Sequence, residues 1–498
     1  MCLTLCLLSS RVPGRGGQWG PAGRVDWVRF LAVATVLTAV LLAGAPTGSA
    51  ADVGANDDSA KYAEDGGAAL YARMFSLGLR QTVIGVRFVP SEAVVIQDKL
   101  QLDRAIASAR GAGLRVVLAV YPYPPREIEA GLGSPSLFAS YVGVLASIYP
   151  HVKQFVIGNE PNQPAFWRPQ FDAAGNGLSA PAFGPYLAAA YDTLKSVDSQ
   201  ISVVGVGLSP RGNDRPAARN NISTSPVRFL RGLGNWYRRS GRTLPLMDAF
   251  SFHPYPNEAT DALERGYAWP NAGFANLDRL KQALWDAFHG TAQPTTLNGL
   301  KLHLDEVGWQ VGTAGRPGYH GLENVAVTDE VTQASIYGQV IREAACDPDV
   351  ATLSFFGFRD DGLRTGFQAG LERADGSPRP AVAAVQAAIA ESCPAPTPAW
   401  SPGLEVLGAK VAVGGTEAAV TARLAAGEDA RAKVCIRQVF LYGSERCRAF
   451  VVQGLRSLNV AVRAPAWITG RVEVAVQFAA EANKKRRTLL VRQTVLRR

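Results

Sequence analysis

The sequence predicts an α/β protein, namely a TIM (β/α)8 barrel followed by a small all-β sandwich domain. Two observations lead to this prediction. Short apolar runs alternate with helix-like stretches eight times over residues 51–391, and short alternating strands without helical stretches fill residues 405–498. Eight consecutive strand–helix units are typical of the barrel, and closely spaced short strands are typical of a sandwich.

The eight apolar runs are spaced so that each interval holds one strand, one helix and their loops. Nearly continuous apolar strands are what a parallel sheet covered on both faces requires. We expect strands near 52–56, 82–88, 115–121, 153–159, 201–207, 247–253, 301–306 and 352–358.

The intervals between these strands show the apolar periodicity of helices. The stretch 99–110 places Leu102, Ala105, Ile106 and Ala109 on one face, and two glycines follow it. Thr328 is expected to cap a later helix. A doubly wound open sheet is the alternative fold. Its dinucleotide-binding form would need a G-x-G-x-x-G turn after the first strand, where residues 54–57 read GAND, so the barrel is preferred.

Residues 1–50 are expected to form a signal peptide or an N-terminal anchor. The 16-residue apolar stretch Phe30–Ala45 follows Arg24 and Arg29, and small residues follow at 47–51. This stretch is shorter than the ~20 residues that comfortably span a bilayer. We therefore predict cleavage near Ala50 or Ala51 and a secreted or extracytoplasmic protein without stable membrane insertion, with an uncleaved anchor as the alternative.

The cysteines fit an exported protein. Two of the six lie in the leader, and the remaining four allow three pairings. We expect the local pairs Cys346–Cys393 and Cys435–Cys447 as structural disulfides, with unpaired buried thiols as the alternative.

A Pro-rich linker over 392–404 separates the predicted barrel, 51–391, from the predicted sandwich, 405–498. The net charge of +9 is concentrated at the two ends of the chain, so composition excludes a broad phosphate-binding face and argues against nucleic acid. The basic C-terminal tail that begins with Lys484–Arg487 is either a solvated face or a contact for an anionic polymer or an envelope surface.

Two glutamates stand at the ends of predicted strands, on the side of the barrel where chemistry takes place. Glu160 follows the fourth strand, and Glu306 is the last residue of the seventh. Retaining glycoside hydrolysis needs two carboxyl groups about 5–5.5 Å apart. One attacks the anomeric carbon, and the other stays protonated, donates to the leaving oxygen and then acts as a base toward water.

The motifs around these glutamates resemble those of the clan A glycoside hydrolases, which are retaining TIM-barrel glycosidases of the cellulase and xylosidase kind. Gly158–Pro161 is similar to their acid/base signature, Asp305–Trp309 to their nucleophile segment, and Ser251–Tyr255 to their His-x-Tyr on strand six. The resemblance implies that Glu160 is the acid/base and Glu306 the nucleophile.

The resemblance also implies substrate-binding residues. Asn159 would bond the sugar 2-hydroxyl, while Arg87 and Tyr255 would orient Glu306 and keep it ionised. Many clan members carry a tryptophan at the end of strand eight as a sugar platform. This chain has Phe358 there, which would stack with a smaller surface.

Other residues near strand ends complete the predicted site. His253 is either a hydrogen-bond partner of the ligand or a satisfied barrel histidine. Tyr121, Tyr123, Trp167 and Trp309 come just after strands and are expected to form sugar-stacking walls, with ordinary packing as the alternative.

The sequence thus predicts a secreted retaining glycoside hydrolase that cleaves β-type O-glycosidic bonds in a poly- or oligosaccharide by double displacement. No cofactor and no metal are expected, because the five histidines show no H-E-x-x-H spacing. A serine hydrolase would need G-x-S-x-G, which is missing. The alternative is a non-catalytic carbohydrate-binding protein on a TIM-barrel scaffold.

Overall fold

The computed structural model describes residues 51–400 apart from 269, 392 and 398. Between 405 and 496 it describes the chain apart from 415–416, 427–429, 439–445, 453–455, 466–469 and 481–486. The predicted leader, 1–50, and the basic residues 484–486 lie outside the described residues.

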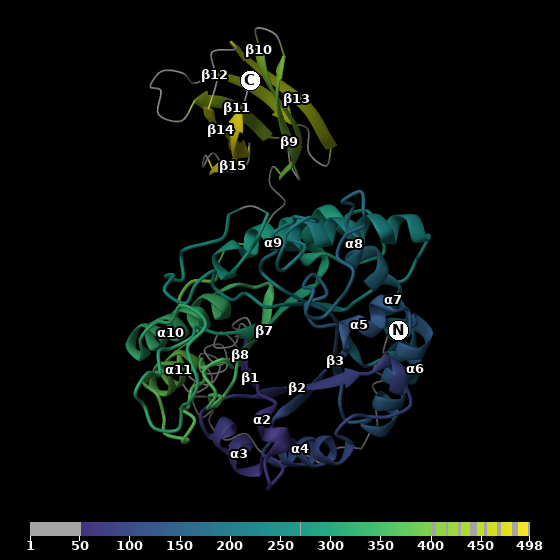
Figure 1. Ribbon diagram of the computed structural model, residues 1–498, viewed down its shortest axis with the longest axis vertical. Coiled ribbons are helices and arrows are strands. Elements are labelled where there is room, and N and C mark those ends of the chain that lie inside the picture. The colour runs from purple at the N-terminus through teal and green to yellow at the C-terminus, as the bar shows by residue number, and fades with distance from the viewer. Residues whose placement is uncertain are drawn as a thin grey trace, which may run out of the picture. The chain divides into compact units, whose positions relative to one another are not determined.

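Eight parallel strands close into a barrel in sequence order, because β1 pairs with both β2 and β8. Figure 1 shows this ring of strands with helices around its outside. The predicted barrel is confirmed, and every predicted strand overlaps an observed one. The strands are β1 Asp52–Asn56, β2 Gln81–Phe88, β3 Arg115–Pro122, β4 Gln154–Ile157, β5 Ser202–Leu208, β6 Ala249–Phe252, β7 Lys301–Val307 and β8 Val350–Phe356.

Helices occupy the intervals between strands. The helix predicted at 99–110 is confirmed as α4, with its four predicted apolar residues buried. The cap predicted at Thr328 is wrong by one residue, since Asp329 accepts the N–H groups of Val331 and Thr332. The helices are α2 Ser59–Tyr62, α3 Ala68–Ser76, α4 Lys99–Gly111, α5 Pro125–Glu129, α6 Pro135–Ile148, α7 Ser179–Val197, α8 Pro226–Ser240, α9 Leu277–Phe288, α10 Glu330–Cys346 and α11 Pro380–Ala390, with short 3-10 turns at Pro90–Glu92, Phe274–Asn276 and Thr296–Asn298.

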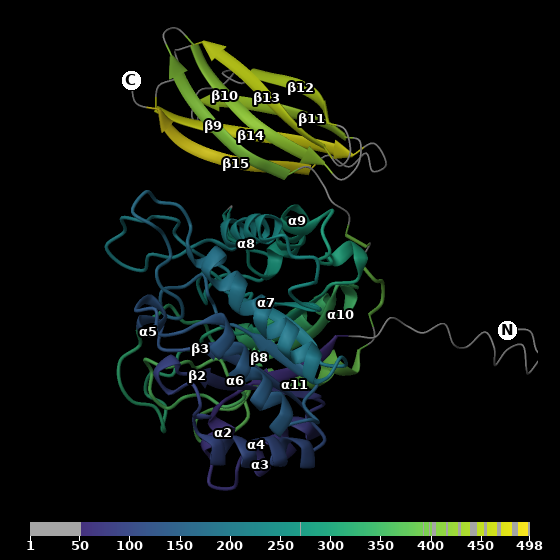
Figure 2. The same ribbon diagram turned by 90° about the vertical axis from the view of Figure 1, so that its right-hand side faces the viewer.

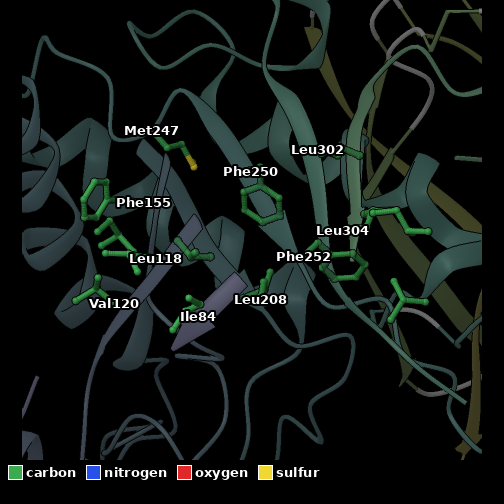
Figure 3. Packing of buried hydrophobic residues seen from close by; sticks show 14 of the residues in the cluster. Ile84, Leu118, Val120, Phe155, Leu208, Met247, Phe250, Phe252, Leu302 and Leu304 are labelled. Atoms are coloured by element: carbon green, nitrogen blue, oxygen red, sulfur yellow. The ribbon is translucent and has the colours of Figure 1, made fainter. Parts of the chain in front are cut away.

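The core has two layers, because successive strand residues point to opposite faces. Large residues such as Ile84, Leu118 and Phe155 pack outward with helix residues into one extensive cluster (Figure 3). A second cluster contains strand residues alone and lines the barrel interior: Val83, Val117, Ala119, Val156, Val204 and Ala249. Burial on both faces explains why these strands read as continuous apolar runs.

The C-terminal segment forms two antiparallel sheets, labelled in Figure 2, as expected for a small sandwich. One sheet has the order β13-β10-β9 and the other β12-β11-β14-β15. Val420 and Leu424 of the first sheet and Val434 and Ile436 of the second are fully buried. The strands are β9 Glu405–Gly414, β10 Glu417–Ala426, β11 Ala430–Gln438, β12 Arg446–Val452, β13 Arg456–Pro465, β14 Gly470–Ala480 and β15 Arg487–Leu496.

Both predicted disulfides are present. Cys346 at the end of α10 is joined to Cys393, which follows α11, and Cys435 on β11 is joined to Cys447 on the paired strand β12. None of the helices that the structure describes is both long and apolar enough to cross a membrane.

Candidate active site

The backbone after β4 turns sharply and carries Glu160 to the carboxyl end of the barrel. Gly158 has φ of +108°, and a Cβ there would lie only 2.7 Å from the Val206 carbonyl oxygen, so glycine is required. Glu160 itself takes the left-handed region, with φ of +41°. Its N–H donates to the carbonyl of Gly207 at 2.7 Å, which ties this turn to the end of β5.

Glu306 is carried by an irregular end of β7. Pairing with β8 shifts register between Leu304 and Val307, and a bulge of this kind re-aims side chains at the rim of a barrel. Asp305, immediately before Glu306, is nearly fully buried and bonds to Ser251 of β6. The irregularity thus brings two consecutive carboxyl groups to one end of the barrel.

His253, just after β6, lies between the two glutamates. Its Nδ1 is 3.2 Å from Glu160 Oε1 and 3.3 Å from Glu306 Oε2. Carboxylate oxygens of the two glutamates lie within 4.8 Å of each other. The structure therefore brings Glu160 and Glu306 together around one imidazole that is only 2% exposed.

Two neutral side chains donate to Glu306. The Tyr255 hydroxyl donates to Oε2 at 2.9 Å, and the Asn56 amide donates to Oε1 at 3.2 Å. Such hydrogen bonds favour the ionised carboxylate. Tyr255 was predicted to lie beside Glu306, whereas Asn56 was missed. Its position as the last residue of the first strand was the signal that could have found it.

Arg87 lies elsewhere than predicted. Its side chain is exposed at the end of β2, and its guanidinium pairs with Asp98 at 3.6 Å and lies over the ring of Tyr123. The expectation that Arg87 orients Glu306 and keeps it ionised is therefore wrong, and Asn56 occupies that role of hydrogen-bond donor.

The electrostatics of the centre follow from burial. Removal from water raises the pKa of Glu306 to about 7, and the charges of Glu160 and Asp305 add to the rise, while His253 and Tyr255 oppose it. Burial disfavours the imidazolium of His253, but Glu306, Glu160 and Asp305 outweigh burial and raise the pKa of His253 to about 9. The surrounding carboxyl groups thus favour the imidazolium form of His253, while burial makes Glu306 harder to ionise.

Three aromatic residues that the sequence predicts to stack on a sugar are buried instead. Trp167 is 2% exposed and packs edge-on against Phe183 and Tyr186 of α7. Trp309 is 1% exposed, with its indole N–H donating to the Asp261 carbonyl, and Phe358 is fully buried. Buried rings offer no face to a sugar, so these three do not form stacking walls.

Other aromatic rings remain partly accessible at the same end of the barrel. Tyr121 and Tyr123, which the sequence predicts just after a strand, are half-buried and contact each other edge to face. Sequence reasoning missed three further half-buried rings, namely Phe166 against Tyr121, and Phe356 and Phe367 against Tyr255. Phe356, not Phe358, is the last residue of β8.

Asn159 is half-buried next to Glu160, where the sequence places it. Glu160, His253 and Glu306 also form a group whose ligand atoms are close enough to hold a metal ion. In the structure His253 contacts both glutamates through Nδ1. The prediction that the site works without a metal stays a prediction.

The chain is similar to known proteins in structure. Neither the scan of protein-family models nor the search of curated proteins found a match. Solved structures similar to the chain include an exo-beta-1,4-mannosidase from Opitutaceae bacterium strain TAV5, with 14% identity, TM-score 0.44, and coverage of 69% of this chain and 61% of the mannosidase.

Two others are Bacteroides uniformis beta-glucuronidase 2 and a Cellvibrio japonicus xylanase in complex with xylopentaose. The glucuronidase is 12% identical with TM-score 0.41, and the match covers 89% of this chain and 45% of that one. The xylanase is 11% identical with TM-score 0.42, and the match covers 71% and 69%. The chain thus spans less than two thirds of the mannosidase and of the glucuronidase.

Proposed function

We propose that the protein is a retaining glycoside hydrolase that cleaves β-type O-glycosidic bonds in a poly- or oligosaccharide, with Glu160 as acid/base and Glu306 as nucleophile. One observation carries the proposal. Two carboxyl groups with oxygens within 4.8 Å of each other stand at the carboxyl end of a (β/α)8 barrel. Retaining enzymes need about 5–5.5 Å, whereas inverting enzymes need about 6.5–9.5 Å to admit a water molecule.

The hydrogen bonds distinguish the two roles. A nucleophile must be ionised when it attacks, and Glu306 accepts two donors, Tyr255 and Asn56, that favour its carboxylate. Glu160 contacts His253 from the turn after β4, whereas Glu306 lies on β7. In the first step Glu306 attacks the anomeric carbon while Glu160 protonates the leaving oxygen. In the second, Glu160 takes a proton from water, which displaces Glu306 from the sugar.

Several half-buried rings near this centre suit a sugar substrate, because aromatic faces bind the apolar faces of pyranose rings. Tyr121, Phe166, Phe356 and Phe367 supply them. We also propose that Asn159 and Arg87 contact substrate hydroxyls and that the protein acts outside the cytoplasm, since two disulfides are stable in an oxidising compartment. We further propose a barrel domain over 51–391, a linker over 392–404 and a sandwich domain over 405–498.

The test measures hydrolysis of activated aryl β-glycosides and of a glycan panel by wild type, Glu160→Ala and Glu306→Ala. The matched control is Glu343→Ala, which removes an exposed glutamate of α10. We expect wild type and control to be equally active and Glu306→Ala to be inactive. Loss of general acid catalysis should lower the activity of Glu160→Ala by about 10²–10⁴-fold, least for substrates with good leaving groups.

The anomeric configuration of the first product decides the mechanism. Proton NMR should show retention with wild type. Azide should restore turnover to Glu160→Ala with retention and to Glu306→Ala with inversion, because it enters from opposite faces in the two variants. An inverted wild-type product would refute the assignment, and binding of glycans without turnover by wild type would show a carbohydrate-binding protein instead.

A further inference from the structure

His253 faces three carboxyl groups rather than two. Its Nδ1 contacts Glu160 and Glu306, and its Nε2 lies 3.5 Å from Asp305 Oδ1. Neutral imidazole has one N–H and one acceptor nitrogen, so it can donate toward only one side. Carboxylates on both sides are matched only by the imidazolium, which donates from both nitrogens.

Asp305 is held where it is by its neighbours. Its side chain is 4% exposed, and the Ser251 hydroxyl lies 2.6 and 2.7 Å from its two oxygens. Its backbone carbonyl accepts the amide of Asn56, the same amide that donates to Glu306. Asp305 is therefore connected to both members of the catalytic pair, yet it stands behind His253.

We propose that Asp305 is a positioning residue that holds His253 as an imidazolium between Glu160 and Glu306 through the whole reaction. The inference rests on the proposed glycosidase function. Asp305 would act only through the imidazole and would not touch the substrate.

The need for such a residue follows from the charges of the two steps. Before attack, Glu306 is negative and Glu160 is protonated. In the glycosyl-enzyme, Glu306 has become an ester and Glu160 a carboxylate. Each member of the pair is thus neutral in one stage, whereas Asp305 stays negative in both. A fixed counter-charge behind the ring keeps the cation in place while the charge in front of it changes sides.

The groups that face His253 from each neighbouring element agree with this. Glu160 comes from the end of β4, and Asp305 and Glu306 come from β7. Tyr255 contacts the ring edge to face from its own loop. Gly207 of β5 approaches without a side chain, since a Cβ there would lie 3.3 Å from Nε2. The carboxyl groups raise the pKa of His253, while burial raises the pKa of Asp305, and His253 and Ser251 act against that rise.

The test follows the His253 ring directly, by NMR of protein labelled at histidine ¹³Cε1. The sequence has five histidines, so the signal is assigned by its loss in His253→Gln. Asp305→Asn keeps the shape of the side chain and removes its charge. Ser251→Ala keeps the charge and removes its hydroxyl donor. Asp248→Asn is the matched control, because Asp248 precedes β6 at the other end of the barrel, where it accepts the N–H of Val203.

We expect the pKa of His253 to fall by about 1–3 pH units in Asp305→Asn, less in Ser251→Ala, and not in the control, because an opposite charge at this distance has an effect of that size. In Asp305→Asn, kcat should fall with KM unchanged. An unchanged His253 titration in folded Asp305→Asn would overturn the proposal. If that variant does not fold, an unchanged titration in Asp305→Ala, which also removes the charge, overturns it. The NMR readout needs no turnover, so an inactive wild type with these same titrations would refute the glycosidase and leave the ion pair standing.

Discussion

Replacing Tyr255 by phenylalanine isolates one hydrogen bond of the proposed nucleophile. The change removes the hydroxyl that donates to Glu306 at 2.9 Å and keeps the ring that packs against Phe356 and Phe367. The donor favours the carboxylate form, so its loss makes Glu306 harder to ionise. The pKa of Glu306, already raised to about 7 by burial, therefore rises further.

The size of the effect follows from the charge of the acceptor. A hydrogen bond to an ionised group contributes about 1.5–3 kcal/mol, which corresponds to about 1–2 pH units. Activity requires ionised Glu306, so the acid limb of kcat/KM against pH should move to higher pH by that amount. On the limb itself, kcat/KM should fall about 10- to 100-fold, and the loss should shrink as pH rises.

The assay is the pH profile of kcat/KM for an activated aryl β-glycoside, measured for wild type, Tyr255→Phe and Tyr237→Phe. Tyr237 of α8 is buried and donates to the Leu244 carbonyl at 2.9 Å, so the control loses an equivalent hydroxyl away from the site. An acid limb that coincides in wild type and Tyr255→Phe would refute the reasoning, as would an equal displacement in the control.

Four further changes probe the site and the fold around it. Gly207→Ala introduces a Cβ at φ of +63° beside the imidazole, so we expect a loss of about 1–2 kcal/mol in urea unfolding together with reduced kcat; unaltered stability would contradict the strain. Phe356→Ala should raise KM about 2- to 13-fold in steady-state kinetics, because its half-buried ring is proposed to contact sugar. Trp309→Ala removes a buried ring and should lower the free energy of unfolding by about 3–5 kcal/mol. The reverse pattern would show that the two rings are misassigned. Breaking Cys346–Cys393, which closes a 47-residue separation, with serine at both positions should cost about 4 kcal/mol of unfolding free energy; equal denaturation midpoints would count against an ordering role of this bridge.

The barrel could be predicted from sequence because its signal is local. Each strand is a short apolar run, since a strand buried on both faces has no polar positions to interrupt it. Glu160 and Glu306 could be located for the same reason, because Glu160 stands shortly after such a run and Glu306 near the end of one. Tyr255 and His253 could be placed near them from their motif on strand six.

The partners and the accessibility of these residues depended on the folded chain. Asn56 is 250 residues from Glu306 along the sequence and reaches it only because β1 closes the barrel next to β8. Trp167 follows the end of β4, and Phe356 is the last residue of β8. Trp167 is nevertheless covered by Phe183 of α7, whereas the ring of Phe356 stays half-buried. A sequence assigns residues to strand ends through local pattern, but distant segments that close over those ends decide which side chains meet, which carry charge and which a sugar can reach.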